Sequence, residues 1–302
     1  MGSGTTATGA LSAFHCNLNV RELSAAARVY EEGFGMRVAM RSRAPRDSRA
    51  FGLTDQTDGE AWFLYDHRSG RVAPAVELMQ WSDPPTQGSA YSSPRDIGMQ
   101  ALGFTVPSVH DAVAALHAAG ATRAVGRRPG SVADVVIDAD GVPLELIADI
   151  GSRATFRYAR LVCSDLDRSA DWYGTIGFEP VGSRRTVSWD TGAGDGEVDE
   201  LTVALGPPGG FSLQLTSWPG PGSSGKGSSG IAHQSPNHRG LFRMALRVDD
   251  VSAAATAARA AGIDASDATF IPLPGTPLGG ATVSFFRDPD GVTVELVENP
   301  RP

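Results

Sequence analysis

Alternating apolar and polar positions recur four times along the chain, each time at the start of a similar segment. Neighbouring side chains of a strand point to opposite faces, so each alternating stretch predicts a strand with one apolar face. These stretches begin at His15, Ala101, Tyr158 and Arg243. Eight residues further on, a leucine or valine opens a segment typical of a helix. The predicted helices span residues 23–32, 109–119, 166–175 and 251–261.

A glycine stands at the end of each predicted helix, where it can adopt the left-handed conformation that closes a helix. These glycines are Gly35, Gly120, Gly177 and Gly262. Each copy then continues with strand-like segments and closes on a related apolar run, centred on Glu77, Glu145, Gln214 and Glu295. A fixed repeat of this kind predicts one structural unit four times over, with the order strand, helix and about three further strands.

Details that only some copies share group the four units in pairs. Units one and three carry a tryptophan after their last strand, whereas units two and four carry an Asp-x-Asp-Gly turn typical of a tight hairpin. The chain is therefore interpreted as a duplicated pair of units, with domains at residues 11–150 and 154–300. In each first strand the apolar face should pack on the helix that follows. The mixed polar and small face should line a concave, solvated cleft.

The closing run Asp-Pro-Asp-Gly-Val-Thr-Val-Glu-Leu-Val-Glu at residues 288–298, together with the repeat, resembles the vicinal oxygen chelate superfamily. That superfamily includes glyoxalase I, fosfomycin-resistance proteins, bleomycin-binding proteins and extradiol ring-cleaving dioxygenases. The resemblance implies an α+β fold in which four βαβββ units form two glyoxalase-like domains with curved half-barrel sheets. It implies small-molecule chemistry in a cavity but does not specify a reaction, because one scaffold hosts many activities.

In metal-dependent members of the superfamily, the ligands lie at the start of the first strand and in the last strand of each unit. The resemblance places His15, Glu77 and Glu145 at such positions in the N-terminal half, with Ala101 at the fourth. One imidazole and two carboxylates suit one divalent ion, and Fe, Mn, Zn and Ni are not distinguished. Glu77 or Glu145 would then act as a general base. Alternatively, both glutamates are hydrogen-bonded in a polar pocket that holds no ion.

The corresponding positions of the C-terminal half predict ligand binding rather than metal binding. The cation at Arg243 would repel a metal ion and is expected to pair with Glu295. Tyr158 and Gln214 can orient an organic ligand by hydrogen bonds. Asn17, on the cleft-facing side of the first strand, is a further expected contact with the ligand.

Composition narrows the partners of the protein. The sequence has 34 acidic against 26 basic residues, which argues against nucleic-acid binding. Its two cysteines fall inside apolar runs, no targeting segment is evident, and no stretch of about 18 apolar residues could span a membrane. We therefore expect a cytoplasmic protein, monomer or homodimer, with a small-molecule partner. Two functions remain open, an enzyme with lyase, isomerase or oxygenase chemistry and a metal-free binding or antibiotic-sequestering protein.

Overall fold

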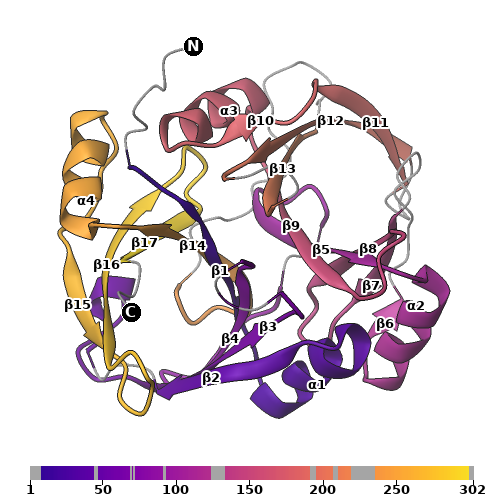
Figure 1. Cartoon of the computed structure of the whole chain (residues 1–302), viewed down its shortest axis with the longest axis horizontal. Helices are drawn as coiled ribbons and strands as arrows, with labels where there is room; N and C mark the ends of the chain where they lie inside the picture. The colour runs from indigo at the N-terminus through magenta and orange to yellow at the C-terminus, as the bar shows by residue number, and fades with distance from the viewer. Residues whose placement is uncertain are drawn as a thin grey trace.

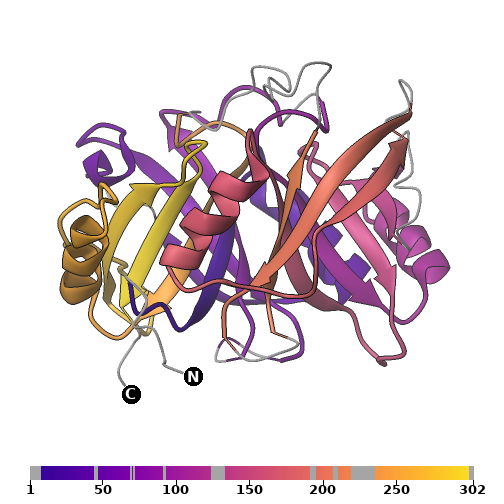
Figure 2. The ribbon, with the colours of Figure 1, turned by 90° about the horizontal axis from the view of Figure 1, so that it is seen from above.

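Two curled sheets lie side by side, with the helices on their outer faces (Figures 1 and 2). The structure is a computed structural model, and the residues that it describes are 8–43, 47–68, 70, 72–90, 93–123, 133–190, 195–206, 210–218 and 235–298. The four predicted units are present, and each consists of a strand, a helix and further strands.

The first two units differ mainly in the length of their outer strands. Unit one contains β1 (Ser12–Asn19), α1 (Leu23–Phe34), β2 (Arg37–Arg43), the short 3-10 helix η1 (Arg49–Phe51), β3 (Asp58–Tyr65) and β4 (Ala75–Asp83). Unit two contains β5 (Gly98–Val106), α2 (Val109–Ala118), β6 (Thr122–Arg123), β7 (Ala133–Ile137) and β8 (Pro143–Ala148).

The last two units repeat this order. Unit three contains β9 (Thr155–Val162), α3 (Leu166–Thr175), β10 (Glu179–Pro180), β11 (Arg185–Asp190), β12 (Asp195–Ala204) and β13 (Ser212–Ser217). Unit four contains β14 (Gly240–Val248), α4 (Val251–Ala260), β15 (Thr269–Pro272), β16 (Gly280–Arg287) and β17 (Thr293–Glu298). All four predicted helices are confirmed to within two residues, and the four predicted glycines have positive φ angles between 64° and 108°.

The sheets combine the units in an order that the sequence repeat did not predict. The eight-stranded sheet runs β15-β16-β17-β14-β1-β4-β3-β2, so it joins unit four to unit one. The nine-stranded sheet contains β10-β12-β13-β9-β5-β8-β7-β6 and the side strand β11, so it joins unit three to unit two. Two half-barrels of paired units are present as expected, and each sheet takes one unit from residues 11–150 and one from residues 154–300.

Pairing of the first strands explains this arrangement. β1 lies antiparallel to β14 and β5 lies antiparallel to β9, so each sheet closes around a pair of first strands from different halves of the chain. Within a unit, the first and last strands are parallel neighbours, as in β1 with β4. The register sets Asn17 beside both Glu77 and Arg243. Ligand positions of units one and four therefore meet at the centre of one concave face.

Helices cover the convex faces, where the apolar sides of the strands are buried. Cys16 and Leu18 of β1, with Val20 just after it, are fully buried and share one continuous core with the buried face of α1. Polar side chains hold the helix N-termini, because the first backbone N–H groups of a helix lack partners within it. The side chains of Glu22, Ser108, Asp165 and Asp250 accept hydrogen bonds from these groups in α1, α2, α3 and α4.

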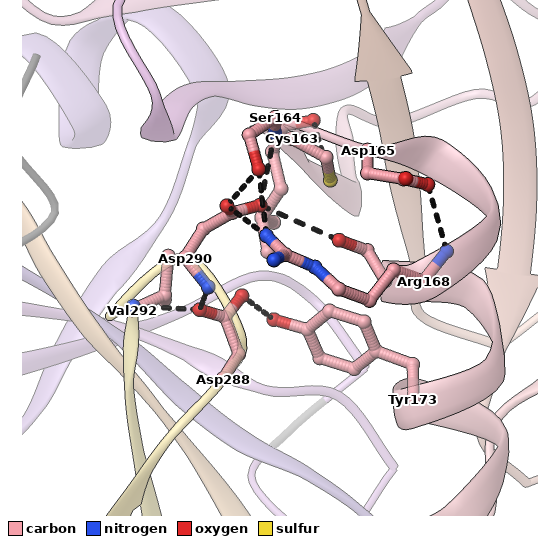
Figure 3. Close-up of polar contacts among 10 residues, drawn as sticks. Cys163, Ser164, Asp165, Arg168, Tyr173, Asp288, Asp290 and Val292 are labelled. Atoms are coloured by element: carbon pink, nitrogen blue, oxygen red, sulfur yellow. Dashed lines mark hydrogen bonds and ion pairs between the residues drawn. The ribbon is translucent and has the colours of Figure 1, made fainter. Parts of the chain in front are cut away.

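The Asp-x-Asp-Gly turns connect units that belong to different sheets. Asp288 of unit four accepts hydrogen bonds at Oδ1 from the backbone N–H of Asp290 and Val292, as a tight turn requires, and at Oδ2 from the hydroxyl of Tyr173 on α3 (Figure 3). Asp290 accepts from Arg168 of the same helix at 2.8 Å. The turn thereby fastens unit four to unit three.

The N-terminal half repeats this contact. The hydroxyl of Tyr30 on α1 donates to Asp138 Oδ2 at 3.0 Å, and Asp138 Oδ1 accepts from the backbone N–H of Asp140 and Val142. Each half of the chain is thus held together by a helix-to-turn contact, while the strands of each sheet come from both halves. Within the described residues, no helix is long and apolar enough to cross a membrane.

Candidate functional site

A cavity of about 420 Å³ opens on the concave face of the eight-stranded sheet. Its apolar walls come from both units. Met40, Ala61, Phe63, Met79 and Trp81 form the unit-one wall, and Ile271, Ala281, Val283 and Val297 form the unit-four wall, with Phe14, Phe51 and Leu273 packed beside them. A cavity of this size with apolar and aromatic walls is typical of a small-molecule site.

Four charged or ionisable side chains form the polar floor of this cavity, and we call them the floor cluster: His15 on β1, Glu77 on β4, Arg243 on β14 and Glu295 on β17. Arg243 donates from Nε to Glu295 Oε2 at 2.7 Å and from Nη2 to Glu77 Oε2 at 2.9 Å. The pairing of Arg243 with Glu295 is therefore confirmed, and Glu77 is a second partner. All four residues are at most 6 % exposed.

Asn17 contacts the floor cluster through Glu77. Its amide donates from Nδ2 to Glu77 Oε2 at 3.0 Å, and the residue is fully buried. The structure thus places Asn17 beside the predicted site, but its contact is with Glu77. A role in ligand binding remains a prediction.

His15 lies between the two carboxylates. Its Nε2 is 3.1 Å from Glu77 Oε2 and 3.4 Å from Glu295 Oε2, which are ion-pair distances when the imidazole is protonated. Its Nδ1 has no hydrogen-bond partner among the described residues. The imidazole packs against the rings of Phe14 and Phe63, with ring centroids 5.3 and 5.6 Å away. The imidazole lines the cavity, but both of its nitrogens are shielded from solvent.

Charge compensation keeps Arg243 and Glu295 of the floor cluster ionised. Burial by itself raises the pKa of Glu295, but the charge of Arg243, with His15 and the hydrogen bond from Arg243, lowers it to about 2. Burial lowers the pKa of Arg243, and the two carboxylates raise it above its ordinary value. The guanidinium is therefore permanently charged between its two partners.

The floor cluster does not fit a divalent ion. Glu77 and Glu295 point their oxygens at a guanidinium, which is a cation and has no lone pair to donate to a metal. Among the described residues, no group of three or more histidine, cysteine, aspartate or glutamate side chains could hold a metal ion. Arg243 takes the place from which a fourth donor would come, and the expected metal ion is not supported by this donor chemistry.

Glu145 lies in the other sheet, so the expected convergence of His15, Glu77 and Glu145 is wrong. Its carboxylate accepts a hydrogen bond from Tyr158 at 2.7 Å and pairs with Arg160 Nε at 2.6 Å. The reason is that β8 pairs with β5, and β5 pairs with β9 instead of with β1. Glu145 is completely buried in this contact.

The remaining predicted ligand contacts divide between the two sheets. Tyr158 on β9 and Gln214 on β13 belong to the nine-stranded sheet, whereas Arg243 and Glu295 line the cavity of the other. Tyr158 packs closely over Gly103, where an added Cβ would lie 2.1 Å from its ring. The five predicted ligand-binding residues therefore do not form one site.

Sequence reasoning missed several residues that shape these two centres. Arg160 occupies a cleft-facing position two residues after Tyr158, and that position could have identified it as a partner for a buried carboxylate. Phe51 lines the cavity from a 3-10 helix that the repeat did not predict, and Phe270 lines it from the edge strand β15. The sequence carries no evident signal for either phenylalanine.

Comparisons with known proteins agree with the fold. The model of the Glyoxalase/Bleomycin resistance protein/Dioxygenase superfamily matches residues 12–146 and 155–296. Glyoxalase I from Zea mays is 20% identical and superimposes with a TM-score of 0.67 over 95% of this chain and 92% of that one. A putative dioxygenase from Bacillus subtilis subsp. subtilis str. 168 is 13% identical, with a TM-score of 0.62 over 97% and 87%. No curated protein matches the chain.

Proposed function

Because the chain belongs to the Glyoxalase/Bleomycin resistance protein/Dioxygenase superfamily, we propose that it binds a small, largely apolar molecule in the cavity of the eight-stranded sheet without a metal ion. One observation carries the proposal: the guanidinium of Arg243 lies between Glu77 and Glu295 at the floor of a cavity with mostly apolar walls. Apolar walls supply affinity, and a few polar groups at the floor orient the ligand.

Binding of a naphthalene-sized probe tests this proposal. Isothermal titration with 2-naphthalenemethanol should give saturable binding to the purified chain, because the walls remove its rings from water. Ala281→Trp would fill the cavity and abolish binding, since Ala281 lines it. Ala257→Trp on the exposed face of α4 is the matched control and should bind as the wild type does. Equal binding by the two variants would place the probe outside the cavity and overturn the proposal.

A second candidate function is proton transfer by His15, which an observation of its own favours. The Nε2 side of the imidazole faces two carboxylates, and its Nδ1 has no partner among the described residues. An imidazole nitrogen without a partner can accept a proton from a substrate that comes within hydrogen-bond reach. It replaces the predicted role of Glu77, whose two oxygens accept from Arg243 and Asn17.

Hydrogen exchange tests this second function directly. In D₂O the methyl protons of 2-acetylnaphthalene should exchange faster with wild-type protein than with His15→Gln, as followed by NMR. Glutamine keeps the polarity of the position but is not basic at neutral pH. Equal exchange rates, with both proteins binding the ketone, would leave the cavity a binding site and remove His15 as a base.

A further inference from the structure

An arginine at the floor of a cavity is commonly associated with anionic ligands, but here its charge is already neutralised. Arg243 donates from Nε to Glu295 and from Nη2 to Glu77, and Glu77 accepts additionally from Asn17. Glu295 is ionised beside the guanidinium, as its lowered pKa indicates. The cation is outnumbered by the two anions that it contacts.

The charge of the floor cluster follows by counting. One guanidinium and two carboxylates carry a net charge of −1, and His15 adds either nothing or +1. The floor is therefore negative or neutral, and in neither state of His15 is it positive. Arg43 and Glu298 also line this cavity, and because their charges are opposite they leave its net charge unchanged.

The net charge of the floor matters because the walls around it are mostly apolar. An uncompensated charge in such an environment costs much more than it does in water. Arg247, the next cation along β14, lies 4.8 Å from the ring of Phe14 and donates to the backbone carbonyl of Gly70. Its cation is thus engaged in contacts away from the floor carboxylates.

His15 belongs to the same cluster through its contacts with both carboxylates. Its Nε2 contacts with Glu77 and Glu295 are attractive when that nitrogen carries a proton. In the neutral ring this leaves the lone pair on Nδ1, which has no partner among the described residues and belongs to a side chain only 3 % exposed. This nitrogen is itself shielded from solvent, so the hydrogen-bond acceptors that line the floor are the carboxylates of Glu77 and Glu295.

We propose that the cavity recognises apolar molecules whose polar end is a hydrogen-bond donor, above all a protonated amine, and that it rejects carboxylates despite the presence of Arg243. This specificity rests on the proposed binding function and goes further by naming the ligand class. Like-charge contact between a ligand carboxylate and Glu77 or Glu295 excludes anions, and the same two groups attract an ammonium.

Three probes of nearly equal size test the proposal on the wild-type chain: 2-naphthylmethylamine, 2-naphthalenemethanol and 2-naphthoate. At pH 7.5 titration calorimetry should rank the amine tightest, then the alcohol, with naphthoate weaker than the amine by about tenfold or more. Naphthoate binding as tightly as the amine would overturn the proposal. Because this comparison uses unaltered protein, it does not depend on the folding of any variant.

Charge variants identify the source of the selectivity. Glu295→Gln makes the floor one unit more positive and should reduce the amine-to-naphthoate ratio at least severalfold. Arg243→Gln combined with Glu295→Gln removes one charge of each sign, so the wild-type ratio should return. Glu179→Gln, on the exposed strand β10 of the other sheet, changes the total charge equally and should leave the ratio unaltered. An unchanged ratio in Glu295→Gln would also overturn the proposal.

Failure of the binding function and failure of the specificity give different results. If none of the three probes binds, the proposed binding function and the specificity that rests on it both fail. If the probes bind and naphthoate is preferred, the binding function stands and the proposed ligand class is wrong.

Discussion

Arg243 on β14 contacts Glu77 on β4 at 2.9 Å, although 166 positions separate the two residues in the chain. The contact joins unit four to unit one across the centre of the eight-stranded sheet. It completes the floor of the cavity and supplies a cation where a metal-dependent relative would need a donor. The proposed ligand specificity therefore rests on this pair, and we expect the stability of the sheet to depend on it as well.

The wild-type protein should show no specific stabilisation by divalent ions. Zn²⁺, Ni²⁺ or Mn²⁺ should not raise the thermal midpoint beyond the effect of Mg²⁺ at the same ionic strength, because the guanidinium of Arg243 blocks the carboxylates. Arg243→His should instead be stabilised by Zn²⁺ or Ni²⁺, since two imidazoles and two carboxylates would face one another. A large rise of the wild-type thermal midpoint with Zn²⁺ would contradict this account.

Removing the cation should destabilise the fold. Arg243→Met leaves Glu77 and Glu295 as uncompensated buried charges, and the free energy of unfolding at pH 7 should fall by about 3–5 kcal/mol. Urea unfolding measures this change. Arg259→Met, which loses a pair with exposed Asp267 on the protein surface, is the control and should change stability by no more than about 1 kcal/mol.

The ion pair of Arg243 with Glu295 should make the stability of the fold sensitive to acid. In the folded protein the pKa of Glu295 is about 2, below its ordinary value. The stability that this ionised carboxylate contributes is therefore complete at a pH above the ordinary pKa, and it is lost as the pH falls toward 2. The difference in unfolding free energy between wild type and Arg243→Met should therefore shrink between pH 7 and pH 3. A difference that stays constant over this range would mean that Arg243 does not act through a carboxylate.

The Asp-x-Asp-Gly turn of Figure 3 should have the opposite effect near neutral pH, where it lowers the stability of the fold as the pH rises. Burial raises the pKa of Asp288 to about 6, although hydrogen bonds from Val292, Tyr173 and Asp290 lower it in part. A raised carboxyl pKa contributes stability that is present in acid and lost as the pH rises through 6. Asp288→Asn should therefore reduce the loss of stability between pH 4.5 and 7 in urea unfolding, whereas exposed Asp171→Asn should not.

Gly103 should be required for the packing of the nine-stranded sheet. A Cβ there would lie 2.1 Å from the ring of Tyr158, so Gly103→Ala should displace that ring from Glu145 and cost about 1–3 kcal/mol. Gly174→Ala on α3 meets no atom within 4 Å and should be neutral or slightly stabilising. Thermal unfolding of both variants checks the contrast, and equal midpoints would contradict it.

Local elements followed directly from the sequence. The alternation that starts at His15 and Tyr158, the helices that follow, and the glycines that end them were all predictable, because strand pleat and helix caps depend on neighbouring residues. The pair formed by Arg243 and Glu295 was predictable for the same reason. Both residues belong to one unit, in which the first and last strands lie side by side.

The composition of the site was not predictable in this way. The four first strands have similar apolar faces, so nothing local decides whether β1 pairs with β5 or with β14. That choice sent Glu145 to Arg160 and Tyr158, and it gave Glu77 a guanidinium in place of a metal partner. The complementary contacts of Tyr30 with Asp138 and of Tyr173 with Asp288 are the signals that tie consecutive units together across the sheets.

The sequence by itself therefore determined the four units, their internal order and the polar side chains offered to a concave face. Only the tertiary structure decided which of those side chains meet. Strand alternation and helix capping are set by residues a few positions apart, whereas the joining of whole units depends on edges and surfaces that become complementary only after each unit has formed. The floor cluster, with His15 and Glu77 from one end of the chain and Arg243 and Glu295 from the other, is the result of that second step.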